Sequence, residues 1–130
     1  QQSTGGGGAT VSGSAGRLIS VASSKIGCPY VWGSKGPNSF DCSGFVYWCL
    51  NQSGVGISYM SSAGWRSPGR FKRVSYGELQ AGDIIVVSGH VGIATGGGGV
   101  IDASSSNGRV VNRSLNGWAS HFIAGWRIFS

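Results

Sequence analysis

The stretch NSFDCSGFVYWCL, residues 38–50, places a cysteine where a polar loop turns into an apolar run. Four side chains recur at the spacing i, i+3, i+4, i+7, which makes one apolar face at the helical period: Cys42, Phe45, Val46 and Cys49. Asp41, directly before this face, is a residue type that caps helix N-termini. The stretch therefore predicts a helix over residues 42–52, with Cys42 in its first turn either as a small buried residue or as a nucleophile.

The segments on either side predict the rest of the fold. Residues 16–27, GRLISVASSKIG, have apolar residues at helical spacing and end on a glycine, so they predict a first helix. After residue 79 the pattern changes to short β-branched runs separated by turn sequences. These runs predict about five strands: residues 83–87, 90–95, 99–104, 108–114 and 122–129. Two helices followed by strands predict an α+β fold with the helices on one face of an antiparallel sheet.

Composition limits the classes of partner. The chain has 130 residues and a net charge of +6, which suits one domain with an anionic partner such as nucleic acid, anionic lipid or a wall polymer. Its basic residues are scattered, and no RNA-binding signature is present, which counts against nucleic acid. One basic cluster is best explained as a solvated loop face: Arg66, Arg70, Lys72 and Arg73. No apolar run approaches the roughly 20 residues that cross a bilayer.

The N-terminal stretch QQSTGGGGATVSGSAG is rich in glycine and serine. Such composition predicts a flexible linker, or a vector-derived remnant, over residues 1–15. One folded domain is then expected over residues 16–130. We interpret the chain as a module of a longer, exported protein.

A cysteine nucleophile acts as a thiolate and needs a base, and the chain has two histidines. His90 begins a predicted strand, where alternation puts it on the same face as Gly92 and Ala94. This face has little bulk, so we expect the helix that carries Cys42 to approach it closely. His121, near the C-terminal end, is the less favoured candidate.

A catalytic imidazole also requires a third group that sets its tautomer and stabilises its charge. Asp102 lies in the neighbouring run GVIDAS, where an aspartate is a poor strand former. Across the GGGG turn, Asp102 and His90 could lie on adjacent strands and face the same way. The alternative is that Asp102 is an exposed residue at a strand end.

Two longer stretches resemble a known family. YVWGSKGPNSFDCSGFVYWCL (residues 30–50) and LQAGDIIVVSGHVGIATGGGGVIDAS (residues 79–104) are similar to the NlpC/P60 family of papain-like cysteine peptidases. The resemblance spans residues 17–129. It implies a papain-like fold, no metal or cofactor, and cleavage of an amide bond in the stem peptides of bacterial peptidoglycan, often the bond from γ-D-glutamate to the diamino acid.

Carried over position by position, the resemblance makes Cys42 the nucleophile, His90 the base and Asp102 the third residue. Tyr30 would line the oxyanion site. Further substrate contacts would come from four residues: Asp41, Ser43, Ser61 and Ser62.

The sequence departs from the family pattern at two places. The third residue is more often His, Asn or Gln, and the negative charge of Asp102 should raise the pKa of His90 and favour a thiolate–imidazolium pair. The arginine that the family has before the substrate serine is absent, since Met60 stands near that position. This second departure leaves the scissile bond open.

The other cysteines allow more than one arrangement. Cys42 and Cys49 are seven residues apart, roughly 10.5 Å along a helix, which is too far for a disulfide. A disulfide between Cys28 and Cys49 would leave Cys42 free and suit an extracellular module. The alternative is two separate buried thiols. No C-x₂-C pair indicates zinc.

The sequence thus predicts a secreted or wall-associated peptidoglycan peptidase, monomeric as a domain, within a longer bacterial, phage or mobile-element protein. Its positive charge would favour anionic wall polymers. Three alternatives stay open: a CHAP-like N-acetylmuramoyl-L-alanine amidase, a cross-bridge endopeptidase, and a non-catalytic wall-binding module. An acyltransferase of similar architecture usually places His before Cys, so the order here argues against it.

Overall fold

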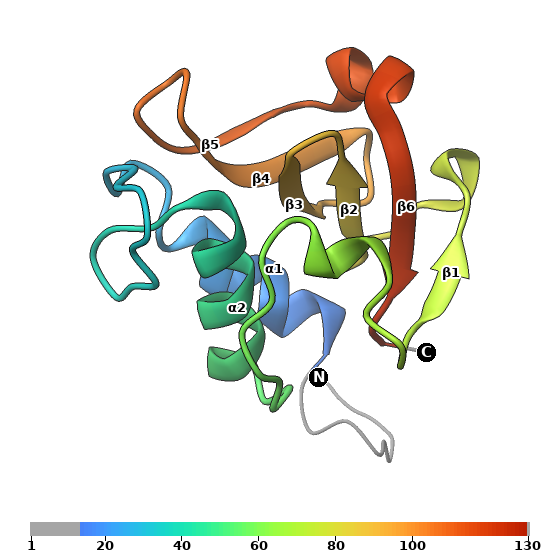
Figure 1. The fold of residues 1–130 in the computed structure, drawn as a ribbon, viewed down its shortest axis with the longest axis horizontal. Helices are drawn as coiled ribbons and strands as arrows, with labels where there is room; N and C mark the ends of the chain where they lie inside the picture. The colour runs from blue at the N-terminus through green and yellow to red at the C-terminus, as the bar shows by residue number, and fades with distance from the viewer. Residues whose placement is uncertain (1–13, 130) are drawn as a thin grey trace.

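The computed structural model describes residues 14–129 and has two α-helices followed by an antiparallel six-stranded sheet (Figure 1). This arrangement confirms the predicted α+β class. The elements, with short 3₁₀ helices labelled η, are α1 (Ala15–Ser23), α2 (Cys42–Gln52), η1 (Gly64–Arg66), β1 (Lys72–Val74), η2 (Tyr76–Glu78), β2 (Ile84–Val87), β3 (His90–Ala94), β4 (Gly99–Ser104), β5 (Arg109–Ser114), η3 (Leu115–His121) and β6 (Phe122–Arg127).

The strands lie in the order β1-β6-β2-β3-β4-β5. Strands β2 to β5 form the predicted meander, whereas β6 returns to pair with β2, and β1 pairs with β6 at the sheet edge. The sheet therefore has six strands instead of about five. Strand β1 was not predicted because it has three residues, of which only Val74 is buried, so it has no alternation to detect. The helix η3 was not predicted either.

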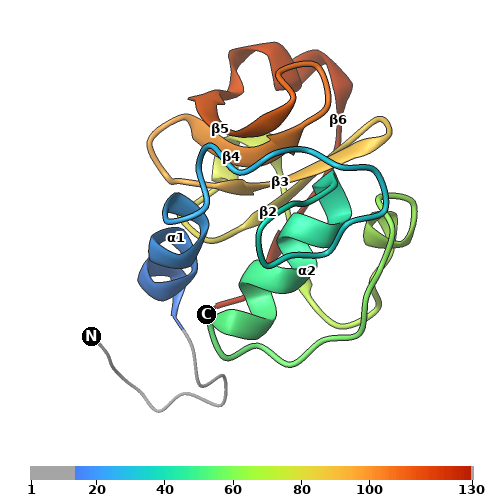
Figure 2. The same ribbon diagram turned by 90° about the vertical axis from the view of Figure 1, so that its left-hand side faces the viewer.

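The two faces of the sheet are buried by different elements (Figure 2). Helices α1 and α2 cover one face, where the core includes Val91 and Ile93 of β3 together with Phe45 and Val46 of α2. The opposite face carries a smaller apolar cluster, to which η3 contributes: Ile85, Val87, Ala94, Val100, Leu115 and Trp118. The sheet is thus covered on both sides and separates α2 from η3.

The expected close approach of α2 to the His90 face is wrong. Helix α2 packs against the Val91 face of β3, whereas Gly92 lies against η3. A Cβ atom on Gly92 would lie 2.9 Å from the Trp118 side chain and 3.1 Å from Cβ of Asp102. The Trp118 indole of η3 occupies the space above the His90 face of β3, so this face requires a small residue at Gly92.

Helix α1 ends at Ser23, earlier than the predicted end at residue 27. Residues 24–27 form turns, in which the amides of Lys25 and Ile26 donate to carbonyls three residues back. Most of the predicted linker, residues 1–13, lies outside the described residues. No helix within residues 14–129 is both long and apolar enough to span a membrane.

All three cysteines are free thiols, so the disulfide between Cys28 and Cys49 is not formed in the structure. Cys49 lies fully buried in the core, and this burial raises the pKa of its thiol. Cys28 is half-buried against the same core. Of the two arrangements that the sequence left open, the structure has the separate thiols.

A buried ion pair joins the start of β2 to the end of β6. The guanidinium of Arg127 donates from Nε to Oδ1 of Asp83 at 2.8 Å and from Nη2 to Oδ2 at 3.0 Å. Asp83 is 1% exposed and also accepts a hydrogen bond from the Gln80 amide. A buried carboxylate requires such partners because removing it from water is costly.

We expect Asp83→Asn to lower the free energy of unfolding by about 3–5 kcal/mol, the usual effect of breaking a buried ion pair on one side. Urea unfolding of wild type and variant would measure the difference. Arg109→Gln, which removes an exposed charge, is the control and should have little effect. An Asp83→Asn variant as stable as wild type would show that the charge contributes nothing beyond a neutral hydrogen bond.

Candidate active site

Cys42 is the first residue of α2, and Asp41 caps the helix as the sequence predicted. The Asp41 carboxylate accepts hydrogen bonds from the Gly44 amide at 2.6 Å and from the Gly33 amide at 3.0 Å. It therefore ties the preceding loop to the helix start. A Cβ atom on Gly44 would collide with the carbonyl oxygen of Ser34, so the close approach of this loop requires glycine.

The half-buried Cys42 lies where the helix dipole and free backbone amides favour negative charge. Negative charge on Cys42 also affects the pKa of Tyr30. Burial raises the pKa of the Tyr30 phenol, and the charges of Cys42 and Asp41 raise it further. The charge of Cys42 thus acts on the Tyr30 phenol.

His90 begins β3 and is held by Asp102 of β4. Nε2 of His90 lies 2.7 Å from Oδ2 of Asp102, whose side chain is 0% exposed. Because Nε2 is engaged, Nδ1 is the ring nitrogen left for Cys42. The structure therefore brings together Cys42, His90 and Asp102 from α2, β3 and β4.

The environment of His90 favours its charged form. Burial of the ring lowers its pKa, but hydrogen bonding to Asp102 and Cys42 and the charges of these two groups outweigh this effect. Together they raise the pKa of His90 to about 9. His90 is therefore an imidazolium at neutral pH, as expected from the charge of Asp102.

A fourth residue, Arg113, belongs to this site and was missed in the sequence. Its guanidinium donates from Nε to Oδ1 of Asp102 at 3.1 Å and from Nη2 to Oδ2 at 2.6 Å. Arg113 reaches Asp102 because it pairs with Val100, two residues away on the same face of β4. Strand alternation puts the Arg113 side chain on one face of β5. Only the pairing register between β4 and β5 shows that it meets Asp102 there.

Trp118 of η3 covers the site from the side opposite α2. Its ring meets the His90 ring edge-on with centroids 5.2 Å apart, and the Arg113 guanidinium lies 5.6 Å from its centroid. Trp118 is buried, so it shields the pairing of Asp102 with these two cations from water. The sequence did not reveal Trp118 because η3 has no regular apolar pattern.

Asp41 and Ser43, which are predicted to contact substrate, are buried and hydrogen-bonded within the protein, and their contact with substrate stays a prediction. Ser43 is 4% exposed, and its Oγ lies 2.7 Å from the Tyr59 hydroxyl. Its hydroxyl also lies 3.4 Å from Asp41 Oδ1. These residues support the start of α2, whereas Tyr59, which was missed in the sequence, is exposed beside them.

Ser61 and Ser62 are not joined to this site by the hydrogen bonds found for residues 14–129. The Ser61 hydroxyl accepts from the Gly64 amide at 3.2 Å and thereby supports η1. The structure gives Ser61 a local structural role, and it gives no contact that favours Ser62 as a substrate ligand.

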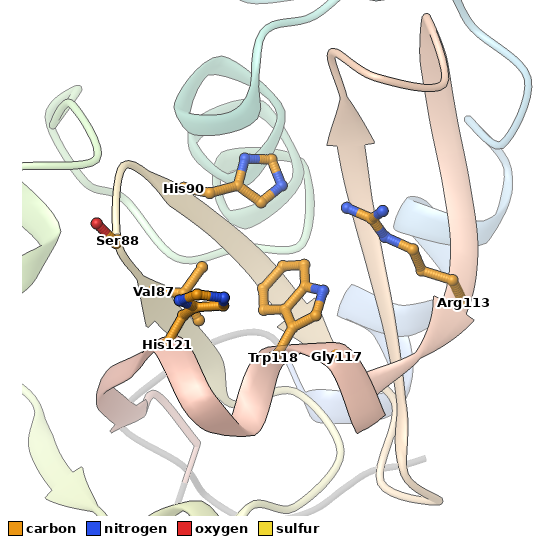
Figure 3. Close-up of a pocket in the computed structure, with 7 residues that line it drawn as sticks. All are labelled: Val87, Ser88, His90, Arg113, Gly117, Trp118 and His121. Atoms are coloured by element: carbon orange, nitrogen blue, oxygen red, sulfur yellow. The ribbon is translucent and has the colours of Figure 1, made fainter.

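A pocket of about 390 Å³ opens beside His90, on the side of η3 (Figure 3). It lies between the turn from β2 to β3, strand β5 and η3. His121, the second histidine of the sequence, borders this pocket, and its side chain lies next to Val87 in the view shown. The lining residues are Val87, Ser88, His90, Arg113, Gly117, Trp118 and His121.

The arrangement has the parts that nucleophilic acyl transfer requires: a thiol at a helix N-terminus, an imidazole beside it, and a carboxylate that orients the imidazole. The model of the NlpC/P60 family matches residues 27–127.

Several known proteins are similar to this chain. A "Probable endopeptidase" of Corynebacterium glutamicum is 43% identical over 102 residues, which cover 76% of this chain and 47% of that protein. "Probable endopeptidase p60" of Listeria grayi is 34% identical over 116 residues, 85% of this chain and 22% of that protein. The crystal structure of the NlpC/p60 domain of the peptidoglycan hydrolase SagA has a TM-score of 0.74 at 30% identity, covering 88% of this chain and 99% of that domain. The chain thus spans about half, or less, of the length of these curated relatives.

We expect the His90 ring to titrate with a midpoint near pH 9 in an NMR titration, well above its ordinary 6.5. Asp102→Asn keeps a polar partner but removes the charge, so it should move the midpoint down toward 6.5. Arg109→Gln is the control and should leave the midpoint unchanged. A midpoint near 6.5 in the wild type would contradict the proposed pairing.

The raised pKa of His90 also makes the free energy of unfolding depend on pH. Because the folded pKa of His90 lies above the unfolded value, its contribution is fully present below pH 6.5 and is lost as the pH rises through about 9. Thermal unfolding of wild type and Asp102→Asn across this window would measure the contribution, which should be smaller in the variant.

Proposed function

Because the chain belongs to the NlpC/P60 family, we propose that it is a cysteine peptidase that hydrolyses an amide bond in the stem peptide of bacterial peptidoglycan. The observation that carries this proposal is the hydrogen bond of 2.7 Å between His90 and the buried Asp102, beside Cys42 at the start of α2. A wall-binding module would not need a buried carboxylate that orients an imidazole toward a thiol.

In the first step, the Cys42 thiolate attacks the amide carbonyl carbon, and the carbonyl oxygen becomes an oxyanion. In this proposal, backbone amides at the start of α2 and the Tyr30 hydroxyl donate to this oxyanion, which is supported by the position of Cys42 at the helix N-terminus. The protonated His90 then gives its Nδ1 proton to the leaving nitrogen as the carbon–nitrogen bond breaks. The products of this step are a thioester on Cys42 and a free amine.

In the second step, His90 takes a proton from a water molecule, which attacks the thioester carbon. The carbon–sulfur bond breaks, the acid product leaves, and the thiolate–imidazolium pair is restored. Asp102 keeps Nε2 of His90 as the hydrogen-bonded end throughout. Arg113 is a positioning residue in this scheme, since its two hydrogen bonds fix the Asp102 carboxylate and it does not touch the reacting atoms.

The bond that we propose is the one from γ-D-glutamate to the diamino acid, as the family resemblance implies. The similar Corynebacterium and Listeria proteins are described as endopeptidases, and the similar SagA domain is described as part of a peptidoglycan hydrolase. These descriptions support cleavage within wall peptides. A CHAP-like amidase or a cross-bridge endopeptidase would use the same nucleophile on a different bond.

We also propose that the domain acts outside the cell, at the wall, as a module of a longer protein. The chain matches about a fifth to a half of the length of its curated relatives, which supports a modular setting. Its net charge of +6 would concentrate it on anionic wall polymers. This attraction concerns where the domain acts and leaves the chemistry at Cys42 unchanged.

We expect wild-type protein to release new γ-D-glutamyl ends from purified peptidoglycan, with the products identified by mass spectrometry. Cys42→Ala should lose this activity by at least about a thousandfold, since the nucleophile is removed. Cys28→Ala, which removes a half-buried thiol elsewhere, is the matched control and should retain activity.

Three other outcomes would change the proposal. Muramoyl–alanine cleavage would assign an amidase, and cut cross-bridges would assign the other endopeptidase. Wall binding without cleavage by wild type would leave a binding module and would contradict the proposed catalytic role of Cys42.

We expect added salt to separate wall binding from catalysis, because salt screens long-range attraction between exposed charges. Raising the salt from about 0.05 to 0.5 M should weaken binding to intact walls several-fold. The same salt should change hydrolysis of a small soluble muropeptide by less than about twofold. Pull-down and chromatographic rate assays would measure the two effects, and equal loss of both would contradict charge-driven attachment.

A further inference from the structure

The pocket beside His90 has a lining of nitrogen and hydroxyl donors. His90, Arg113 and His121 contribute nitrogen atoms, Ser88 at the turn from β2 to β3 contributes a hydroxyl, and Trp118 contributes an aromatic wall (Figure 3). No Asp or Glu side chain is among the lining residues found in the described chain. Its volume of about 390 Å³ is within the range of about 300–1,000 Å³ typical of small-ligand sites.

The charge balance of the pocket favours an anion. His90, protonated below about pH 9, and Arg113 carry positive charges and both line the pocket. The negative groups that pair with them, the carboxylate of Asp102 and the thiolate of Cys42 in the proposed mechanism, do not line it. Asp102 is 0% exposed, so it presents no negative surface to the pocket. The charged groups His90 and Arg113 therefore present positive charge to the pocket at neutral pH.

Arg113 retains donor capacity toward the pocket. Its hydrogen bonds to Asp102 use Nε and Nη2, and its side chain is 34% exposed. Within the part of the chain that the structure describes, Nη1 has no assigned partner and can donate to a ligand. A guanidinium fixed in this way loses little freedom when it binds a carboxylate.

The position of the pocket relates it to one half of the substrate. Cys42 does not line it, and α2 packs on the opposite face of the sheet. In the proposed function, His90 protonates the departing amine, so the residue attached to that amine leaves on the His90 side. The pocket borders the same ring on the side of η3, so a leaving residue that extends from Nδ1 past the imidazole would reach it.

We propose that this pocket binds a carboxylate carried by the leaving-group residue, so that the protein prefers substrates whose released amine belongs to a residue with a free carboxylate. The carboxylate could be on the side chain of that residue or at its C-terminus, since both present the same chemistry to Arg113, His121 and Ser88. This inference rests on the proposed function. It adds a selectivity for the departing half that the proposed bond does not by itself require.

Four matched synthetic peptides test the preference. All share the same γ-D-glutamyl acyl half, and the leaving residue has its side-chain and C-terminal groups each as acid or amide, in the four combinations. We expect kcat/KM for the diacid to exceed that for the diamide by about tenfold at pH 7 and low salt, the effect of roughly one charge-assisted hydrogen bond. The two mixed peptides show which carboxylate is bound.

Variants of the pocket test which residues carry the preference. His121→Gln and Ser88→Ala should each lower the acid-to-amide ratio of kcat/KM by about two- to fivefold. Arg109→Gln is the matched control, because it removes a positive charge from the same strand at a residue that does not line the pocket. An equal fall in Arg109→Gln would assign the effect to overall charge and would overturn the pocket assignment.

Binding without turnover gives a second, independent measurement. Cys42→Ala would be titrated with the diacid and the diamide leaving residues, each as the free amine, while the ring signals of His90 and His121 are followed by NMR. We expect shifts of both rings with the diacid and little change with the diamide.

The outcomes separate this inference from the proposed function. Hydrolysis of all four peptides at equal rates, with no difference in the NMR titration, would overturn the carboxylate pocket and leave the peptidase assignment standing. Hydrolysis of none of them, or of purified peptidoglycan, by wild type would overturn the peptidase assignment and the inference together.

Discussion

The site depends on one buried carboxylate. Asp102 is fully buried on β4, and a charge in that position is tolerated only if paired and hydrogen-bonded. His90 from β3 and Arg113 from β5 supply the partners. Three neighbouring strands must therefore keep one register, since a shift by one residue would move Asp102 or Arg113 to the other face of the sheet. The same pairing that satisfies the carboxylate orients the imidazole.

Different elements pack on the two faces of the sheet. Helix α2 packs on one face and brings Cys42 to the edge where β3 begins, whereas η3 packs on the other face and places Trp118 over His90. Gly92 makes this second contact close, because a side chain there would meet the indole. His90, at the first position of β3, can therefore be reached from the thiol side and can border the pocket on the other side.

The residues around Cys42 mainly fix the start of α2, which carries this thiol. Asp41 caps α2 and binds the Gly33 amide, and Ser43 is buried against Tyr59. Gly44 lets the loop backbone approach the first turn of the helix. The D-C-S-G motif is thus explained by helix capping and close packing, which keep the Cys42 thiol at the helix start.

Local pattern was enough to predict α2 with its cap at Asp41, the meander and the α+β class, because each rests on periodicity and chemistry within a short segment. The same local chemistry proposed Cys42, His90 and Asp102 as candidates, family resemblance gave them roles, and the structure brings these three together. Only the tertiary structure could show Arg113 against Asp102, or the burial of Asp41 between the Gly33 loop and the start of α2. Strand register and the packing of an irregular segment such as η3 are set by contacts between distant parts of the chain. No local window of the sequence contains that information.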